Sequence, residues 1–244
     1  MRGKTQGIQA VVFDLDGTLV DSFDTIIQAF NHTMDQFGLE RLPRECIRRS
    51  VGISLRQIMA EHVAPGEVDK AVGIYRARQM QILFEGTRLM PGAKETLELL
   101  HEDGYCLGVL TNKPGWMART ILQHYGLAPL LGVILGIDEV NRPKPEADGI
   151  AAAASCLGAS LLSLVYVGDS PVDVEAAAKA QVPAIIVEGG AASPEDLSRM
   201  IGITVVPSLH HLPDLLMNLS CKGRAGDTVP PPEVAGAPAK VSHG

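Results

Sequence analysis

Paired cysteines, long apolar runs and an excess of basic charge are all missing from this sequence of 244 residues. The four cysteines lie at least fifty positions apart, which excludes a zinc knuckle or a paired redox motif and predicts free thiols in a reducing cytoplasm. No apolar run reaches the ~20 residues of a membrane span, and the polar start lacks the apolar stretch of a secretory signal. The net charge of −7 argues against nucleic acid as the main partner.

Aromatic residues make up only 4% of the chain, but hydrophobic residues reach 46% and charged residues only 20%, which predicts a folded core. Apolar runs rich in β-branched residues recur between helical stretches. Such alternation predicts an α/β fold with a doubly wound, Rossmann-like parallel sheet covered on both faces. The expected strands are 8–13, 106–110, 132–137, 164–167, 184–187 and 203–206.

About ninety residues separate the first two expected strands, far more than an ordinary crossover needs. Residues 22–84 show helical spacing of apolar residues, so we expect an α-helical cap inserted into a core made of 1–21 and 85–219. The three stripes are Phe23, Ile27, Phe30, Met34 and Phe37; then Leu55, Met59 and His62; then Val68, Val72, Tyr75 and Gln79. The remainder, 220–244, is rich in glycine and proline and is expected to be a disordered tail.

Charge differs between these parts. The cap segment holds eight Lys and Arg against seven Asp and Glu, whereas the expected core carries −9. An acidic core beside a nearly neutral insertion suits a metal-dependent enzyme that acts on phosphates, although ordinary surface charge explains it equally well.

The end of the first expected strand carries the strongest chemical signal. Asp14 and Asp16 are two positions apart, so in extended chain both side chains point to the same side. Two carboxylates at the carboxyl end of a strand repel each other unless a cation joins them or one holds a proton. Gly17 allows a sharp turn, and we expect its exposed backbone N–H to suit an anion.

Three later segments follow other strands. Thr111 and Asn112 come after the second strand, and Thr111 alone would more often be a structural cap. Lys144 lies between two prolines before a helix, where a solvated surface lysine is the ordinary alternative. Asp169 directly follows a strand, and Asp173 could serve only to cap the next helix.

The four segments in this order, with the insertion after the first, resemble the haloacid dehalogenase superfamily, in the branch near the phosphoglycolate phosphatases. The resemblance covers about residues 8–216. It implies a Mg²⁺-dependent phosphatase that hydrolyses a small phosphorylated metabolite. Asp14 would attack phosphorus to form an aspartyl-phosphate, and Asp16 would protonate the leaving alcohol and later activate water.

The resemblance also implies the remaining roles. Mg²⁺ would be held by Asp14, the backbone carbonyl of Asp16 and Asp169, with Asp173 orienting metal waters or the lysine from behind. The phosphoryl group would be bound by Gly17, Thr111, Asn112 and Lys144. A sugar-phosphate mutase and a pyrophosphatase of the same superfamily stay open as alternatives, and a non-catalytic phosphate-binding protein is a further one.

The cap is expected to choose the substrate through the string 48–56, which joins two expected cap helices with Gly52 at the turn. Arg56 is the favoured contact, because its guanidinium could bind a carboxylate or a second phosphate. Arg48 and Arg49 are expected to cover the outer cap surface. We expect a cytoplasmic monomer or homodimer whose partner is the small metabolite, with neither nucleic acid nor membrane involved.

Overall fold

The computed structural model describes residues 7–222 of the chain. The tail predicted to be disordered, 220–244, therefore lies outside the described residues except for 220–222, which end the last helix. No described helix is both long enough and apolar enough to span a membrane.

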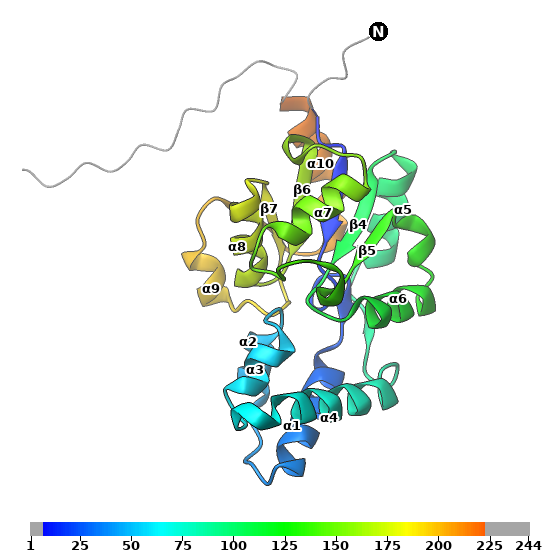
Figure 1. Ribbon diagram of the computed structural model, residues 1–244. Helices are drawn as coiled ribbons and strands as arrows, with labels where there is room; N and C mark the ends of the chain where they lie inside the picture. Colours follow the sequence, from blue (N-terminus) through cyan, green and yellow to red (C-terminus); the bar gives the residue numbers. More distant parts are fainter. Residues whose placement is uncertain (1–6, 223–244) are drawn as a thin grey trace, which may run out of the picture.

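A six-stranded parallel sheet forms the centre of the larger part (Figure 1). Its strand order is β5-β4-β1-β6-β7-β8, which confirms the predicted doubly wound α/β fold. The register places Phe13 of β1 opposite Val109 of β4 and Val167 of β6, so the carboxyl ends of these strands reach one edge together. The strands are β1 (Ala10–Phe13), β4 (Cys106–Leu110), β5 (Val133–Leu135), β6 (Leu164–Gly168), β7 (Ala184–Val187) and β8 (Ile203–Val206).

Helices cover both faces of the sheet because alternate strand residues point in opposite directions. Val11 and Phe13 face a cluster with α5, α6 and α10, whereas Ala10 and Val12 face a second cluster with α7 and α8. The helices of this part are α5 (Ala93–Glu102), α6 (Gly115–His124), α7 (Asp148–Cys156), α8 (Pro171–Ala180), α9 (Pro194–Arg199) and α10 (Leu212–Lys222). Short 3-10 turns lie at Pro65–Glu67, Ala128–Leu130, Ile137–Glu139, Leu161–Ser163 and Leu209–His211.

Four further helices form the cap, at one end of the sheet in Figure 1. They are α1 (Phe23–Gln36), α2 (Arg44–Ser50), α3 (Leu55–Ala60) and α4 (Val68–Gln81). Their apolar faces share a separate cluster that includes Phe30, Met34 and Tyr75. Two sequence expectations need correction: His62 lies beyond the end of α3, and Arg48 to Ser50 belong to α2 rather than to a linking loop.

Two very short strands connect the cap to the core. β2 (Val20–Asp21) and β3 (Arg88–Leu89) pair antiparallel, with Val20 opposite Leu89. Two-residue strands carry no readable periodicity, so the sequence did not predict them. The division into core and cap stays a prediction, which the separate apolar clusters support.

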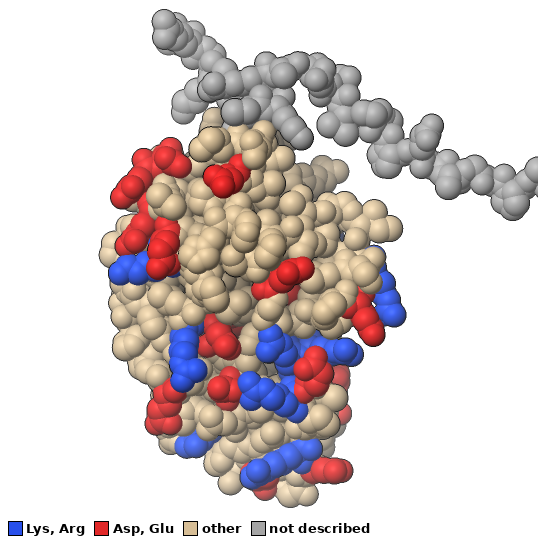
Figure 2. Space-filling view, turned by 180° about the vertical axis from the view of Figure 1, so that it is seen from behind, with Lys and Arg blue, Asp and Glu red and all other residues tan. Residues whose placement is uncertain are grey.

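Figure 2 shows charged side chains of both signs on the half of the molecule that holds the cap, with Lys and Arg interspersed among Asp and Glu. This mixture fits the nearly balanced charge of residues 22–84.

Candidate active site

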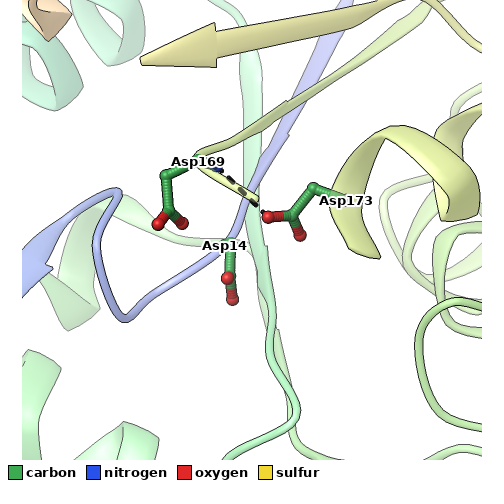
Figure 3. A group of neighbouring side chains, drawn as sticks. All are labelled: Asp14, Asp169 and Asp173. Carbon is green, nitrogen blue, oxygen red and sulfur yellow. Dashed lines mark hydrogen bonds between the residues drawn. The ribbon is translucent and has the colours of Figure 1, made fainter. Parts of the chain in front are cut away.

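Three carboxylates converge at the carboxyl edge of the sheet (Figure 3). Asp14 directly follows β1, Asp169 directly follows β6, and Asp173 lies in the first turn of α8. One oxygen from each lies within 4.8 Å of the others, and all three residues are buried. The edge forms because neighbouring parallel strands end together, which is why residues far apart in sequence meet here.

Lys144 is the positive charge inside this group. Its side chain is fully buried, and Nζ lies 2.9 Å from Asp14 Oδ1 and 2.7 Å from Asp173 Oδ1. The ammonium donates a hydrogen bond to Asp173 and forms an ion pair with Asp14. Burial alone would lower the pKa of Lys144, but Asp14 and Asp173 outweigh it and raise that pKa well above its usual value.

The cluster carries more negative than positive charge, and the pKa values of two of its acids are raised. Burial raises the pKa of Asp14 to about 7, with Lys144 lowering it and Asp173 and Asp16 raising it further. Burial, Asp173 and Asp14 likewise raise the pKa of Asp169 well above its usual value. Since three carboxylates face one ammonium, a bound divalent cation would restore the balance.

The donor set fits such a cation. Asp14 Oδ1 is buried and has no hydrogen-bond partner among the described residues, and the surrounding donors are carboxylate oxygens, which hard divalent ions prefer. Within residues 7–222, the Asp169 carboxylate accepts two hydrogen bonds, from Thr18 Oγ1 at 3.0 Å and from the Ala191 N–H at 2.6 Å, which leaves lone pairs on both oxygens.

In contrast, both carboxylate oxygens of Asp173 accept hydrogen bonds from other protein groups. Its Oδ2 accepts hydrogen bonds from the N–H of Asp169 at 3.2 Å, from the N–H of Ser170 at 3.1 Å and from Ser170 Oγ at 2.6 Å. Its Oδ1 accepts from Lys144 and, at 3.3 Å, from the Tyr166 hydroxyl. Asp173 therefore closes the first turn of α8 and fixes the position of the Lys144 ammonium.

Gly17 has a different role from the one expected. Its N–H donates to the Val20 carbonyl at 2.7 Å, so this donor is already occupied and the expectation that it serves an anion is wrong. The residue is needed for space and conformation: φ is +86°, and a Cβ there would lie 2.1 Å from Asp169 Oδ2.

Asp16 pairs with a residue whose contribution the sequence did not reveal. Lys113 Nζ lies 2.9 Å from Asp16 Oδ2, its side chain is only 5% exposed, and Ser22 Oγ donates to the other oxygen of the same carboxylate. Lys113 directly follows Thr111 and Asn112, so its position next to two predicted site residues was the one sequence signal that it lies near the site. Its partner is set by tertiary packing and could not be read from spacing.

Asn112 ties the cap to the core. Its Nδ2 donates to the Gly52 carbonyl at 2.7 Å and to the Lys144 carbonyl at 2.8 Å, and its Oδ1 accepts from the Lys144 N–H at 3.1 Å. Because all these groups are backbone, the side-chain amide positions a cap turn and the lysine loop. The expected role of Asn112 as a phosphate ligand stays a prediction, and the residue does line the cavity. Thr111 is buried, lines the cavity, and accepts from the Lys113 N–H at 3.1 Å.

A cavity of about 110 Å³ lies between this edge and the cap. Asp14, Asp16 and Thr111 line it from the core, and Tyr75 and Arg76 of α4 line it from the cap.

The arginines of the cap differ from expectation. Arg48 donates from Nε and Nη2 to the Gly190 carbonyl at 3.0 and 2.8 Å, and its guanidinium lies 4.1 Å from the centre of the Phe23 ring. It therefore joins cap to core instead of covering the outer surface. Arg56 lines the cavity rim but pairs with Asp69 on the exposed cap surface, with side chains 64% and 81% exposed.

Comparison with known proteins agrees with this geometry. The sequence model of the haloacid dehalogenase-like hydrolases matches residues 11–187. A plasmid-encoded phosphoglycolate phosphatase of Cupriavidus necator is 32% identical over 213 residues, covering 85% of this chain and 92% of that protein. The pyrophosphatase PpaX of Halalkalibacterium halodurans is 30% identical, covering 89% of this chain and 99% of the relative.

A solved structure described as a predicted phosphatase from Clostridium acetobutylicum superposes with a TM-score of 0.78 at 26% identity, covering 87% of this chain and all of that one. The family match extends over the strands that carry Asp14, Thr111 and Asp169, together with the cap between the first two. This chain belongs to the haloacid dehalogenase-like hydrolase family and is one of its phosphatases.

Proposed function

We propose that this protein is a Mg²⁺-dependent phosphatase that hydrolyses a small phosphomonoester of the phosphoglycolate type through an aspartyl-phosphate on Asp14. The observation that carries the proposal is the buried Asp14 carboxylate, which faces the cavity with one oxygen lacking a hydrogen-bond partner and with Lys144 at 2.9 Å. The name of the Cupriavidus relative supports the substrate class.

Asp14, Asp169 and the backbone carbonyl of Asp16 are the groups that would hold Mg²⁺. The support is the all-oxygen donor set, together with the pKa values of Asp14 and Asp169, which are raised by burial first and by the neighbouring carboxylates next. When bound, the ion neutralises charge on the carboxylate and on the phosphate, two anions that otherwise repel each other.

Asp14 is the nucleophile. Its carboxylate oxygen forms a bond to phosphorus while the bond from phosphorus to the leaving oxygen breaks. Lys144 balances the charge that both groups bring together, and Thr111 binds a phosphoryl oxygen through its hydroxyl. Asp173 holds the Lys144 ammonium at 2.7 Å, so the cation is already oriented before a substrate arrives.

Asp16 moves the protons. It protonates the leaving oxygen in the first half of the reaction, then takes a proton from the water that cleaves the aspartyl-phosphate. Lys113 Nζ, 2.9 Å from Asp16 Oδ2, holds this carboxylate in place for both steps. Products are inorganic phosphate and the alcohol, and Asp14 returns to its starting state.

The cap excludes bulk water from the cavity while the first step takes place. Three cysteines, Cys46, Cys106 and Cys156, are free and exposed, which supports a reducing compartment such as the cytoplasm for this activity.

Pyrophosphate hydrolysis is the second candidate, and the similarity to the pyrophosphatase PpaX favours it. Phosphate release from 2-phosphoglycolate, pyrophosphate and glucose 1-phosphate, each with Mg²⁺ and with EDTA, tests the proposal. We expect metal-dependent release from phosphoglycolate at the highest kcat/KM. Preference for pyrophosphate would select the second candidate, transfer of the phosphoryl group between sugar positions would indicate a mutase, and metal-independent release would refute the Mg²⁺ role.

A further inference from the structure

Arg76 is a cation on the cap side of the cavity whose charge the catalytic steps do not use. It lies on α4, next to Tyr75 in sequence and three positions before Gln79, and all three side chains line the cavity. Tyr75 and Gln79 are buried, and Arg76 is partly buried. Burial and the nearby Asp16 carboxylate raise the pKa of the Tyr75 hydroxyl, so this face of α4 looks toward the catalytic acid.

The other charged groups that line the cavity already have partners. Lys113 pairs with Asp16, Asp14 pairs with Lys144, and Arg56 pairs with Asp69 on the outer surface. Arg76 differs, because its Nε is buried and has no hydrogen-bond partner among the described residues.

A buried guanidinium donor without a protein partner must find its acceptor among water or ligand atoms in the cavity, or else it destabilises the protein. An apolar residue of similar length would fill the same position at no such cost. The retained charge therefore indicates a function, and its position in the cavity indicates that the ligand is the substrate.

We propose that Arg76 is the specificity-determining residue of this site, binding an anionic oxygen group that the substrate carries beyond its reacting phosphate. This inference rests on the proposed phosphatase function and identifies the substrate class as small phosphates with a second anion. A carboxylate or a second phosphoryl group meets this requirement, since each offers paired oxygens to the planar guanidinium.

Arg56, the residue that the sequence favoured, is the natural competitor for this role. Its guanidinium is already paired with Asp69 outside the cavity, so an incoming anion would have to displace a carboxylate. Arg76 needs no such exchange. The two positions thus make opposite predictions for the same measurement.

The test uses equilibrium binding of unreactive phosphonates, measured by calorimetry with Mg²⁺ present. 3-Phosphonopropionate carries a carboxylate, methylenediphosphonate carries a second phosphonate, and propylphosphonate carries neither. We expect the wild type to bind one of the first two at least about tenfold more tightly than propylphosphonate, which is the range of a charge-assisted hydrogen bond. Whichever of the two binds more tightly identifies the chemistry of the second anion.

Arg76→Met should remove most of that preference, and Arg76→Lys should restore part of it. Arg78→Met on the same helix is the matched control, because Arg78 bonds to Gln81 at 3.3 Å, away from the residues that line the cavity. We also expect the melting temperature of Arg76→Met to equal or exceed that of the wild type, since an unpartnered buried donor is removed. A residue with a purely structural role would give a lower melting temperature.

An unchanged preference in Arg76→Met, or a preference lost in Arg56→Met instead, would overturn the inference. So would a wild type that binds all three phosphonates equally. Failure of the wild type to release phosphate from any substrate would refute the proposed function, yet the binding preference and its loss in Arg76→Met would still support Arg76 as an anion site.

Discussion

The core side and the cap side of the cavity are built differently. On the core side, charged groups contact one another: Asp173 accepts hydrogen bonds from Lys144, from Tyr166 and from the start of α8, and Asp14 forms an ion pair with Lys144. On the cap side, Arg76 offers a buried donor with no partner among the described residues. Under the proposed function, this difference means that the groups for phosphoryl transfer are positioned in advance, whereas the group for substrate selection gains its partner only when the substrate binds.

The largest effect should come from the nucleophile. Asp14→Asn should lower kcat/KM by more than about 10³ for every substrate, because an amide cannot attack phosphorus. Phosphate release by the purified variant measures this, with Asp35→Asn as control, since Asp35 lies on α1 and pairs with Arg41 at the surface. Activity within tenfold of the wild type would refute the assignment of Asp14.

Asp16→Asn separates two kinds of leaving group. We expect kcat to fall about 10²–10⁴-fold for alkyl phosphates, which need a proton, and clearly less for p-nitrophenyl phosphate, whose leaving group needs none. Rates of phosphate release for both substrates check this. Equal losses would mean that Asp16 acts through structure, for example by holding Lys113, and does not transfer protons.

Arg48→Ala tests the contact that holds the cap on the core. Losing its hydrogen bonds to Gly190 and its contact with Phe23 should raise KM about 3–10-fold, since a typical hydrogen bond contributes ~1 kcal/mol. The rise should be alike for substrates with and without a second anion, in contrast to Arg76. Arg49→Ala is the control, because Arg49 forms its ion pair with Glu45 within α2 at 3.7 Å. A substrate-dependent rise would place Arg48 in selection instead of closure.

The smallest effect concerns pH and metal. The pKa of Asp14 is raised from 3.8 to about 7 in the folded state, so without metal the folded state keeps a proton that the unfolded state loses. Stability from this group therefore falls as pH rises from about 4 to about 7 and stays low above that. Mg²⁺ binds the deprotonated form, so it should raise the melting temperature by at least about 2 °C more at pH 8 than at pH 5. Differential scanning fluorimetry measures this, and an equal rise at both pH values would contradict it.

The parts of the fold that the sequence predicts are those with a long periodic signal. The six predicted apolar runs are the six strands of the sheet. Asp14 and Asp169 meet because parallel strands end at one edge, which can be inferred without coordinates. Strands β2 and β3 were not predicted because two residues show no period.

Other features depend on how elements pack. The stripe through Tyr75 predicts the helix α4, but only tertiary structure shows that the rotation of this helix brings Arg76 to the cavity. Arg56 and Asp69 are thirteen positions apart on different helices, so their pairing could not be inferred from helical spacing. The hydrogen bond from Asn112 Nδ2 to the Gly52 carbonyl likewise could not be predicted, because it depends on how the cap packs on the core.

The antiparallel pairing of β2 with β3 has a mechanical consequence for the cap. The chain enters the cap after Asp21 and leaves it before Arg88, and these two residues are partners in that pairing. The two covalent connections between the cap and the core therefore lie side by side. A rotation of the cap about these two connections would separate Gly52, which contacts the core elsewhere, from Asn112 and Ser170.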